Sequence, residues 1–86
     1  KRAEMMVDVA KSRYSAGEWA KALELFEDAL KAAKIKDRPR LTAEIKRYIG
    51  NIKIRIGDFD GAEKDFKEAE AISKNIFDRK GMVEAV

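Results

Sequence analysis

The sequence predicts an all-α protein, a solenoid of two antiparallel helical hairpins followed by the start of a further helix. Three observations predict this fold. Apolar residues recur at intervals of three and four along four segments. Turns that contain glycine separate these segments. The chain also resembles itself after a shift of 40 residues, which indicates a repeat architecture more than a simple four-helix bundle, the alternative that would bury the same stripes.

The first two helices are expected to form one hairpin. The first runs over residues 2–15, and four residues are expected on its packing face, Met6, Val9, Ala10 and Tyr14. Gly17 follows at the place where a left-handed cap is expected. The second helix carries a continuous apolar stripe, formed by Trp19, Ala22, Leu23, Phe26, Ala29, Leu30 and Ala33. Acids near its start, with Lys31 and Lys34 at its end, suit the helix dipole.

The next two helices are expected to form a second hairpin. Asp37 is expected to cap the third helix and Pro39 to lie in its first turn. This helix ends near Ile56, and its inward residues are Leu41, Ile45, Tyr48, Ile49 and Ile52. The stripe of the fourth helix holds Phe59, Ala62, Phe66, Ala69, Ile72 and Ile76. We expect a break at residues 78–81 and the first turn of a fifth helix from residue 82.

The 40-residue shift superimposes residues of the same character. Gly17 falls on Gly57, and the aromatic residues Trp19 and Phe26 fall on aromatic residues. The small residues Ala10, Ala22 and Ala29 fall on Gly50, Ala62 and Ala69. Small residues let two antiparallel helices approach closely. Trp19 and Phe59 are expected to close the base of each hairpin.

These residues resemble the tetratricopeptide repeat. The family's three small positions match the three Ala above and their counterparts, and its Gly–acidic–aromatic turn matches residues 17–19 and 57–59. The period is 40 and not 34. The family's Trp and Tyr on the first helix are replaced, by Met6 and Arg13 and then by Lys46 and Lys53. The resemblance implies a right-handed solenoid, one domain over residues 1–86, with repeats at 3–36 and 43–76, a connector at 37–42 and the start of a third repeat at 80–86.

The resemblance implies a scaffold that binds a peptide or protein segment in a concave groove. The groove positions are Glu4, Val7, Lys11, Tyr14, Glu44, Arg47, Asn51 and Ile54, and all except the two Glu are predicted contacts. In the family's carboxylate-clamp members, a basic residue and an Asn stand where Arg47 and Asn51 stand here and grip a terminal carboxylate. The first repeat has Val7 and Lys11 instead, so the clamp is incomplete. Tyr14 and Ile54 are predicted to supply apolar contact.

Charge is unevenly distributed along the chain. Residues 31–56 hold nine Lys and Arg against two acids, a net charge of +7, and residues 57–70 hold six acids against two Lys, a net charge of −4. The basic third helix therefore predicts an acidic partner. A basic corner, formed by Lys31, Lys34, Lys36, Arg38 and Arg40, contains no aromatic residue and is interrupted by an acid. We interpret it as a solvated loop, with no nucleic-acid or membrane partner.

The chain contains no Cys and no His. It therefore lacks disulfides, thiolate nucleophiles, Cys or His metal ligands and the commonest general acid–base. Residues 58–61 resemble the middle of a calcium loop, but Ile56 and Lys67 occupy the positions where such a loop needs acids, so Asp58 is interpreted as a helix N-cap. We predict no enzyme activity and no cofactor.

The sequence has no apolar run of about eighteen residues and no leader-like segment. We therefore predict a cytoplasmic protein. Because the chain begins at Lys1 and not at Met, we expect it to be processed or excised from a longer protein. The alternative function is a structural or oligomerisation module, because the uncapped repeat ends would allow self-association.

Overall fold

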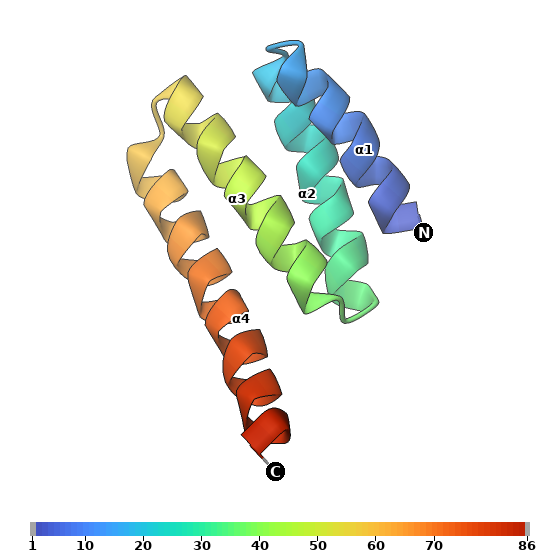
Figure 1. Ribbon diagram of the computed structural model, residues 1–86. Helices are drawn as coiled ribbons and strands as arrows, with labels where there is room; N and C mark the ends of the chain where they lie inside the picture. The colour runs from blue at the N-terminus through green and yellow to red at the C-terminus, as the bar shows by residue number, and fades with distance from the viewer. Residues whose placement is uncertain (1, 86) are drawn as a thin grey trace.

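The computed structural model describes the backbone of residues 2–85 and the side chains of residues 3–76. The described chain forms four helices, α1 (Arg2–Ser15), α2 (Trp19–Ile35), α3 (Pro39–Ile56) and α4 (Phe59–Ala85). α1 packs against α2, α2 against α3, and α3 against α4 (Figure 1). The predicted all-α fold of two helical hairpins is confirmed.

Glycines with positive φ make the two hairpin turns. Gly17 has φ 78° and Gly57 has φ 90°, a left-handed conformation that glycine adopts without a Cβ clash. Asp58 then caps α4, because its Oδ1 accepts a hydrogen bond of 3.1 Å from the backbone N–H of Gly61. The left-handed cap at Gly17 and the Asp58 cap agree with the sequence analysis, and Gly57 repeats the conformation of Gly17.

The connector between the hairpins differs from the prediction. Asp37 itself is left-handed, with φ 52°. The N-cap of α3 is Arg38, which makes no side-chain capping hydrogen bond, and Pro39 is the first helical residue. The predicted capping role of Asp37 is therefore wrong, because the chain reverses at this residue, one position before the cap.

The fourth helix is longer than the sequence predicts. α4 continues through Ala85, and the break expected at residues 78–81 is not present. A glycine inside a helix destabilises it by only about 1 kcal/mol, and Arg and Lys are good helix formers. Gly81 beside Arg79 and Lys80 therefore does not end the helix. The predicted first turn of a fifth helix is part of α4.

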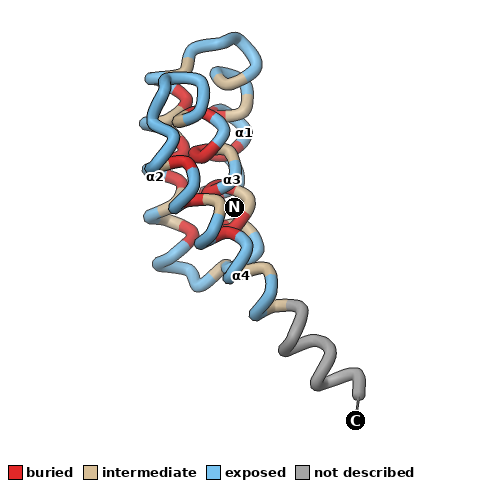
Figure 2. Tube along the Cα trace, turned by 90° about the vertical axis from the view of Figure 1, so that its left-hand side faces the viewer, coloured by how far each residue is buried: buried red, intermediate tan, exposed pale blue. Residues whose placement is uncertain are grey.

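The hydrophobic core lies between α1, α2 and α3. Its buried residues are Val7, Ala10, Ala22, Phe26, Ala29, Ala33, Ile45, Ile49 and Ile52, and Figure 2 shows the buried segments of the helices facing one another. Phe26 is fully buried and stacks on Tyr48 with ring centroids 4.9 Å apart. Three alanines on α2 keep the helices close enough for this contact.

Two residues predicted to be internal lie at the surface. Val9 is 49% exposed and Phe59 is 66% exposed. Their repeat counterparts are covered: Ile49 lies in the core, and Trp19 contacts Tyr14. Positions of this kind are buried only where another hairpin lies against them. The predictions that Val9 packs inward and that Phe59 closes its hairpin base are therefore wrong.

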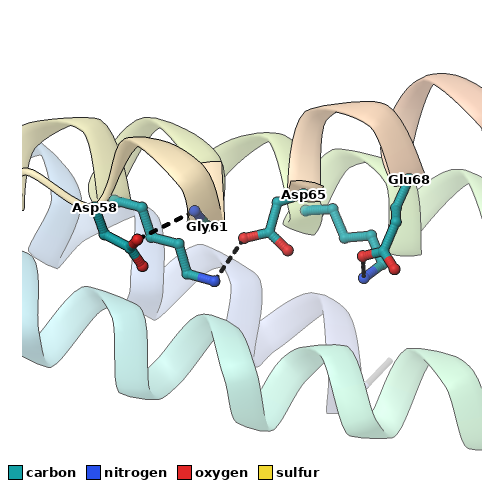
Figure 3. A network of polar contacts seen from close by, with 6 residues as sticks. Asp58, Gly61, Asp65 and Glu68 are labelled. Carbon is teal, nitrogen blue, oxygen red and sulfur yellow. Dashed lines mark hydrogen bonds and ion pairs between the residues drawn. The ribbon is translucent and has the colours of Figure 1, made fainter. Parts of the chain in front are cut away.

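Two lysines of α3 join it to α4. Lys46 Nζ donates to Glu68 Oε1 at 2.9 Å, and Lys53 Nζ lies 2.8 Å from Asp65 Oδ2 (Figure 3). The contact between Lys53 and Asp65 is a close ion pair. It is not a well-aligned hydrogen bond, because the buried Asp65 Oδ2 accepts none from the described residues. The positions that carry Met6 and Arg13 in the first hairpin thus carry, in the second, lysines that pair with acids of α4.

Glu68→Gln is expected to make stability less sensitive to acid. The hydrogen bond from Lys46 lowers the pKa of Glu68. A carboxyl with a lowered pKa stabilises the fold above its unfolded pKa of about 4.3 and loses this contribution as pH falls through the folded pKa. Because the Glu68 side chain is half exposed, the loss at pH 7 should stay below about 1 kcal/mol.

Urea unfolding at pH 7 and at pH 3 measures this effect. The variant should be less stable than the wild type at pH 7 and close to it at pH 3. Glu70→Gln is the matched control, because it removes an exposed acid from the same helix. An equal deficit at both pH values would show that the carboxylate charge is not the cause.

Candidate functional site

Side chains of α1 and α3, the first helices of the two hairpins, contact each other directly. Lys11 Nζ lies 3.0 Å from Glu44 Oε1. The rings of Tyr14 and Tyr48 pack edge to face, with centroids 5.3 Å apart. At the connector, Arg38 donates a hydrogen bond of 2.9 Å to Glu4 Oε1, which lowers the pKa of Glu4.

A chain of aromatic rings joins the hairpins beside these contacts. Phe26 stacks on Tyr48, Tyr48 meets Tyr14, and Tyr14 meets Trp19 at 5.4 Å. The Arg55 guanidinium lies 5.6 Å from the centre of the Trp19 ring, a cation–π contact. The sequence analysis missed this cluster. Its signal was the number of aromatic residues on α1, α2 and α3, but contacts between residues 22 to 36 positions apart are not visible in a helical pattern.

The predicted contacts of the first repeat are occupied by the protein itself. Val7 is 3% exposed and belongs to the core, so its predicted place in the groove is wrong. Lys11 is held by Glu44, whose hydrogen bond raises the pKa of Lys11, and Tyr14 is half buried in the ring cluster. The physical reason is that α3 covers this side of α1.

The predicted contacts of the second repeat remain at the surface. Arg47 and Asn51 are exposed, and Ile54 is 43% exposed. Residues spaced three and four apart lie on the same side of a helix. We call these three residues the outer side of α3. Arg47 also donates a hydrogen bond of 2.8 Å to Ser73 Oγ on α4, which directs its guanidinium toward the border with α4.

The outer side of α3 is suited to bind a carboxylate. A guanidinium has five N–H donors in a planar fork, of which Ser73 takes one. The Asn51 amide, one turn further, offers two more donors. Arg40 is exposed two turns before Arg47 and adds positive charge. The arrangement offers charge-assisted hydrogen bonds to an acidic group and apolar contact at Ile54.

Other kinds of site find no support in the part of the chain that the structure describes. No three acidic side chains there lie close enough to hold a metal ion. None of the helices searched is both long and apolar enough to span a membrane. Asp58, which the sequence analysis interprets as a helix N-cap, accepts a hydrogen bond from the backbone N–H of Gly61 in its own helix.

Comparison with known families supports the interpretation of the repeat. A family model described as tetratricopeptide repeat matches residues 1–75, a range that spans α1, α2, α3 and more than half of α4. Comparisons with curated proteins and with solved structures find no match. The match therefore covers the first hairpin and most of the second.

Proposed function

Since this chain belongs to the tetratricopeptide repeat family, whose domains are typically non-catalytic modules for protein–protein interaction, we propose that it binds a segment of another protein along the outer side of α3. One observation carries the proposal. Arg47, Asn51 and Ile54 stay at the surface, whereas the same positions of the first repeat are used to hold the two hairpins together.

An acidic segment is the ligand class that fits these residues. Arg47 and Asn51 present donors and no competing carboxylate of their own, and charge-assisted hydrogen bonds are the stronger kind. The net charge of +7 over residues 31–56 attracts an acidic segment before contact. Ile54 lies one turn beyond Asn51 and contacts an apolar side chain next to the acid.

Arg47→Ala is expected to weaken the binding of an acidic peptide at least tenfold. Hydrogen bonds to charged groups contribute about 1.5–3 kcal/mol each, and tenfold in affinity corresponds to about 1.4 kcal/mol. Fluorescence anisotropy of labelled acidic, neutral and basic peptides measures the effect at low and moderate salt. Arg47→Lys should give an intermediate loss, because it keeps the charge and removes the planar fork.

Lys31→Ala is the matched control, because it removes one exposed positive charge from α2. Its effect should be small and should disappear with salt, as expected for a charge that only attracts the ligand. The proposal fails if acidic, neutral and basic peptides bind equally, or if none of them binds.

A further inference from the structure

Three lysines from three successive helices gather around the carboxylate of Glu68. Lys46 of α3 donates a hydrogen bond of 2.9 Å to Glu68 Oε1 (Figure 3). Lys64 precedes Glu68 by one turn of α4 and so lies on the same side of that helix. Lys34 belongs to the last turn of α2. The hydrogen bond from Lys46 lowers the pKa of Glu68, and the charges of Lys64 and Lys34 act in the same direction. We call these three lysines the lysine cluster.

Positive charge exceeds negative charge around this carboxylate. Two neighbouring acids of α4 have other partners, since Glu63 and Asp65 each pair with a lysine outside the cluster, at 2.9 Å and 2.8 Å. Asp60 lies two turns before the cluster's carboxylate on α4. On the α2 side, Asp37 is the one acid within residues 29–40, which hold five Lys and Arg. The cluster therefore attracts more negative charge than its own carboxylate supplies.

The deepest cation of the cluster lies beneath a carboxylate that solvent reaches. Lys46 is 8% exposed, whereas the Glu68 side chain is 46% exposed. Lys34 and Lys64 are both exposed. A buried ammonium group needs a charged partner, because desolvation without one is costly. An anion from solution can supply that partner when the Glu68 side chain turns outward, and it then lies within reach of the two exposed lysines.

The first hairpin shows that the fold does not need these cations. At the positions of the α3 lysine, the α4 lysine and the α4 carboxylate, the first hairpin has Met6, Glu24 and Asp28. Met6 packs against the core, and an apolar side chain there requires no desolvation of a charge. The second hairpin instead buries a charge at a position where an apolar residue suffices, which favours a role in binding over a role in stability.

We propose that Lys34, Lys46 and Lys64 form a binding site for a phosphate group, and that Glu68 occupies this site in the unliganded protein. The inference goes beyond the proposed function and uses other residues. Lys46 and Arg47 are consecutive residues of α3 and therefore point to different sides of the helix. The phosphate site and the carboxylate site proposed at Arg47 are thus separate.

The charge of the ligand decides between a phosphate and a carboxylate. A single carboxylate would only replace the charge of Glu68. A phosphate monoester carries a charge of about −1.5 to −2 at pH 7 and has three strong acceptor oxygens, so it offers one oxygen to each lysine. Lysine binds phosphate as a point charge and does not need the fork geometry of arginine. The same group occurs as free phosphate and on a phosphorylated side chain.

Titration with inorganic phosphate, followed by nuclear magnetic resonance of the isotope-labelled chain at constant ionic strength, tests the site. We expect saturable shifts of the backbone amides of Lys46 and Glu68, and no such shifts with chloride. Glu68→Gln should bind phosphate about tenfold more tightly, because the competing carboxylate is removed. Lys46→Met, which introduces the residue of the first hairpin, should bind it about tenfold more weakly.

A second variant makes the test independent of any change in the buried residue. Lys34→Gln together with Lys64→Gln removes two exposed charges and leaves the contact between Lys46 and Glu68 in place. It should weaken phosphate binding about tenfold or more. Lys21→Gln is the matched control, because it removes an exposed lysine from the other end of α2 and should leave the dissociation constant unchanged.

A phosphoserine peptide and its unphosphorylated form separate the two sources of the phosphate group. Tighter binding of the phosphopeptide than of inorganic phosphate assigns the site to a phosphorylated segment, and equal binding assigns it to free phosphate. The inference is wrong if the variant lacking Lys34 and Lys64 binds phosphate as well as the wild type. It is also wrong if Arg47→Ala abolishes the binding, or if Glu68→Gln leaves it unchanged.

Discussion

Phe26→Ala is expected to lower the free energy of unfolding by about 3–5 kcal/mol, the range for removing a buried Phe. Phe26 is fully buried, and its stack on Tyr48 joins the first hairpin to the second. A domain of 86 residues has a total stability of about 4–13 kcal/mol at 0.05–0.15 kcal/mol per residue. The variant should therefore lose a large share of its stability and be partly unfolded at 37 °C.

Urea unfolding, followed by Trp19 fluorescence and by far-ultraviolet circular dichroism, measures this loss. Phe66→Ala is the matched control, because it makes the same change at the repeat counterpart, which is only half buried. Its loss should be clearly smaller, since less apolar surface returns to water. Equal losses for the two variants would show that the difference in burial between the hairpins does not hold in solution.

Local signals explain why the helices could be predicted from the sequence. Gly17 and Gly57 end helices because the backbone turns left-handed at each, and Pro39 begins one because it lacks the N–H that a first helical turn does not need. The segment of alternating Ile and basic residues at 52–56 is helical, as its place in a longer helical pattern predicts. Two local signals were poor guides. Gly81 does not end α4, because one glycine does not end a helix without further signals, and Asp37 turns left-handed one residue before the cap of α3.

Which side of a helix is covered is not a local property. The sequence of α1 is apolar on several sides, at Met5, Met6, Val7 and Val9. Val7 is buried because it belongs to the core cluster with residues of α2 and α3. Val9 is exposed because no hairpin lies against it in the described chain. The internal repeat indicates which positions need a neighbouring hairpin to be buried. Val9 corresponds to Ile49, which lies in the core between the two hairpins.

The candidate site was predictable in part for the same reason. The placing of Arg47 and Asn51 one turn apart follows from helix geometry alone, and the structure shows both at the surface. The residues that pair with these and other polar side chains of α3 did not follow from helix geometry. Glu44 is held by Lys11, 33 positions away, and Ser73 accepts from Arg47, 26 positions away. Pairs of this kind depend on how the two hairpins lie against each other.

Asp65→Ala is expected to lower the free energy of unfolding by about 2–3 kcal/mol. Removing one member of a buried ion pair destabilises by about 3–5 kcal/mol, because the other charge stays buried and unpaired. The Lys53 side chain is 23% exposed, so its ammonium group can partly reach water, and the loss should fall below that range. Asp65→Asn, which keeps the shape and removes the charge, should lose less than Asp65→Ala.

The first hairpin suggests a double variant that should recover the stability lost in Asp65→Ala. In the first hairpin, Arg13 and Leu25 stand at the positions of Lys53 and Asp65. Arg13 forms an ion pair of 3.2 Å with Glu18, and Leu25 packs against the core. Asp58 is the counterpart of Glu18, and its charge acts on Lys53 in the same direction as that of Asp65. In the double variant Lys53→Arg with Asp65→Leu, the guanidinium introduced at position 53 should therefore form an exposed ion pair with Asp58. The leucine side chain introduced at position 65 should form an apolar contact below this pair. We expect it to equal or exceed the wild type in stability.

Alkaline pH distinguishes this double variant from the wild type. The contact with Asp65 raises the pKa of Lys53. A lysine with a raised pKa stabilises the fold below its unfolded pKa of about 10.4, and this contribution is lost as pH rises through the folded pKa. Urea unfolding at pH 7 and pH 11 should show a smaller loss for the double variant, because Arg stays protonated. If the double variant were as unstable as Asp65→Ala at pH 7, the second hairpin would need a charge at position 65 that the first does without, and the equivalence of the two repeats would fail at this contact.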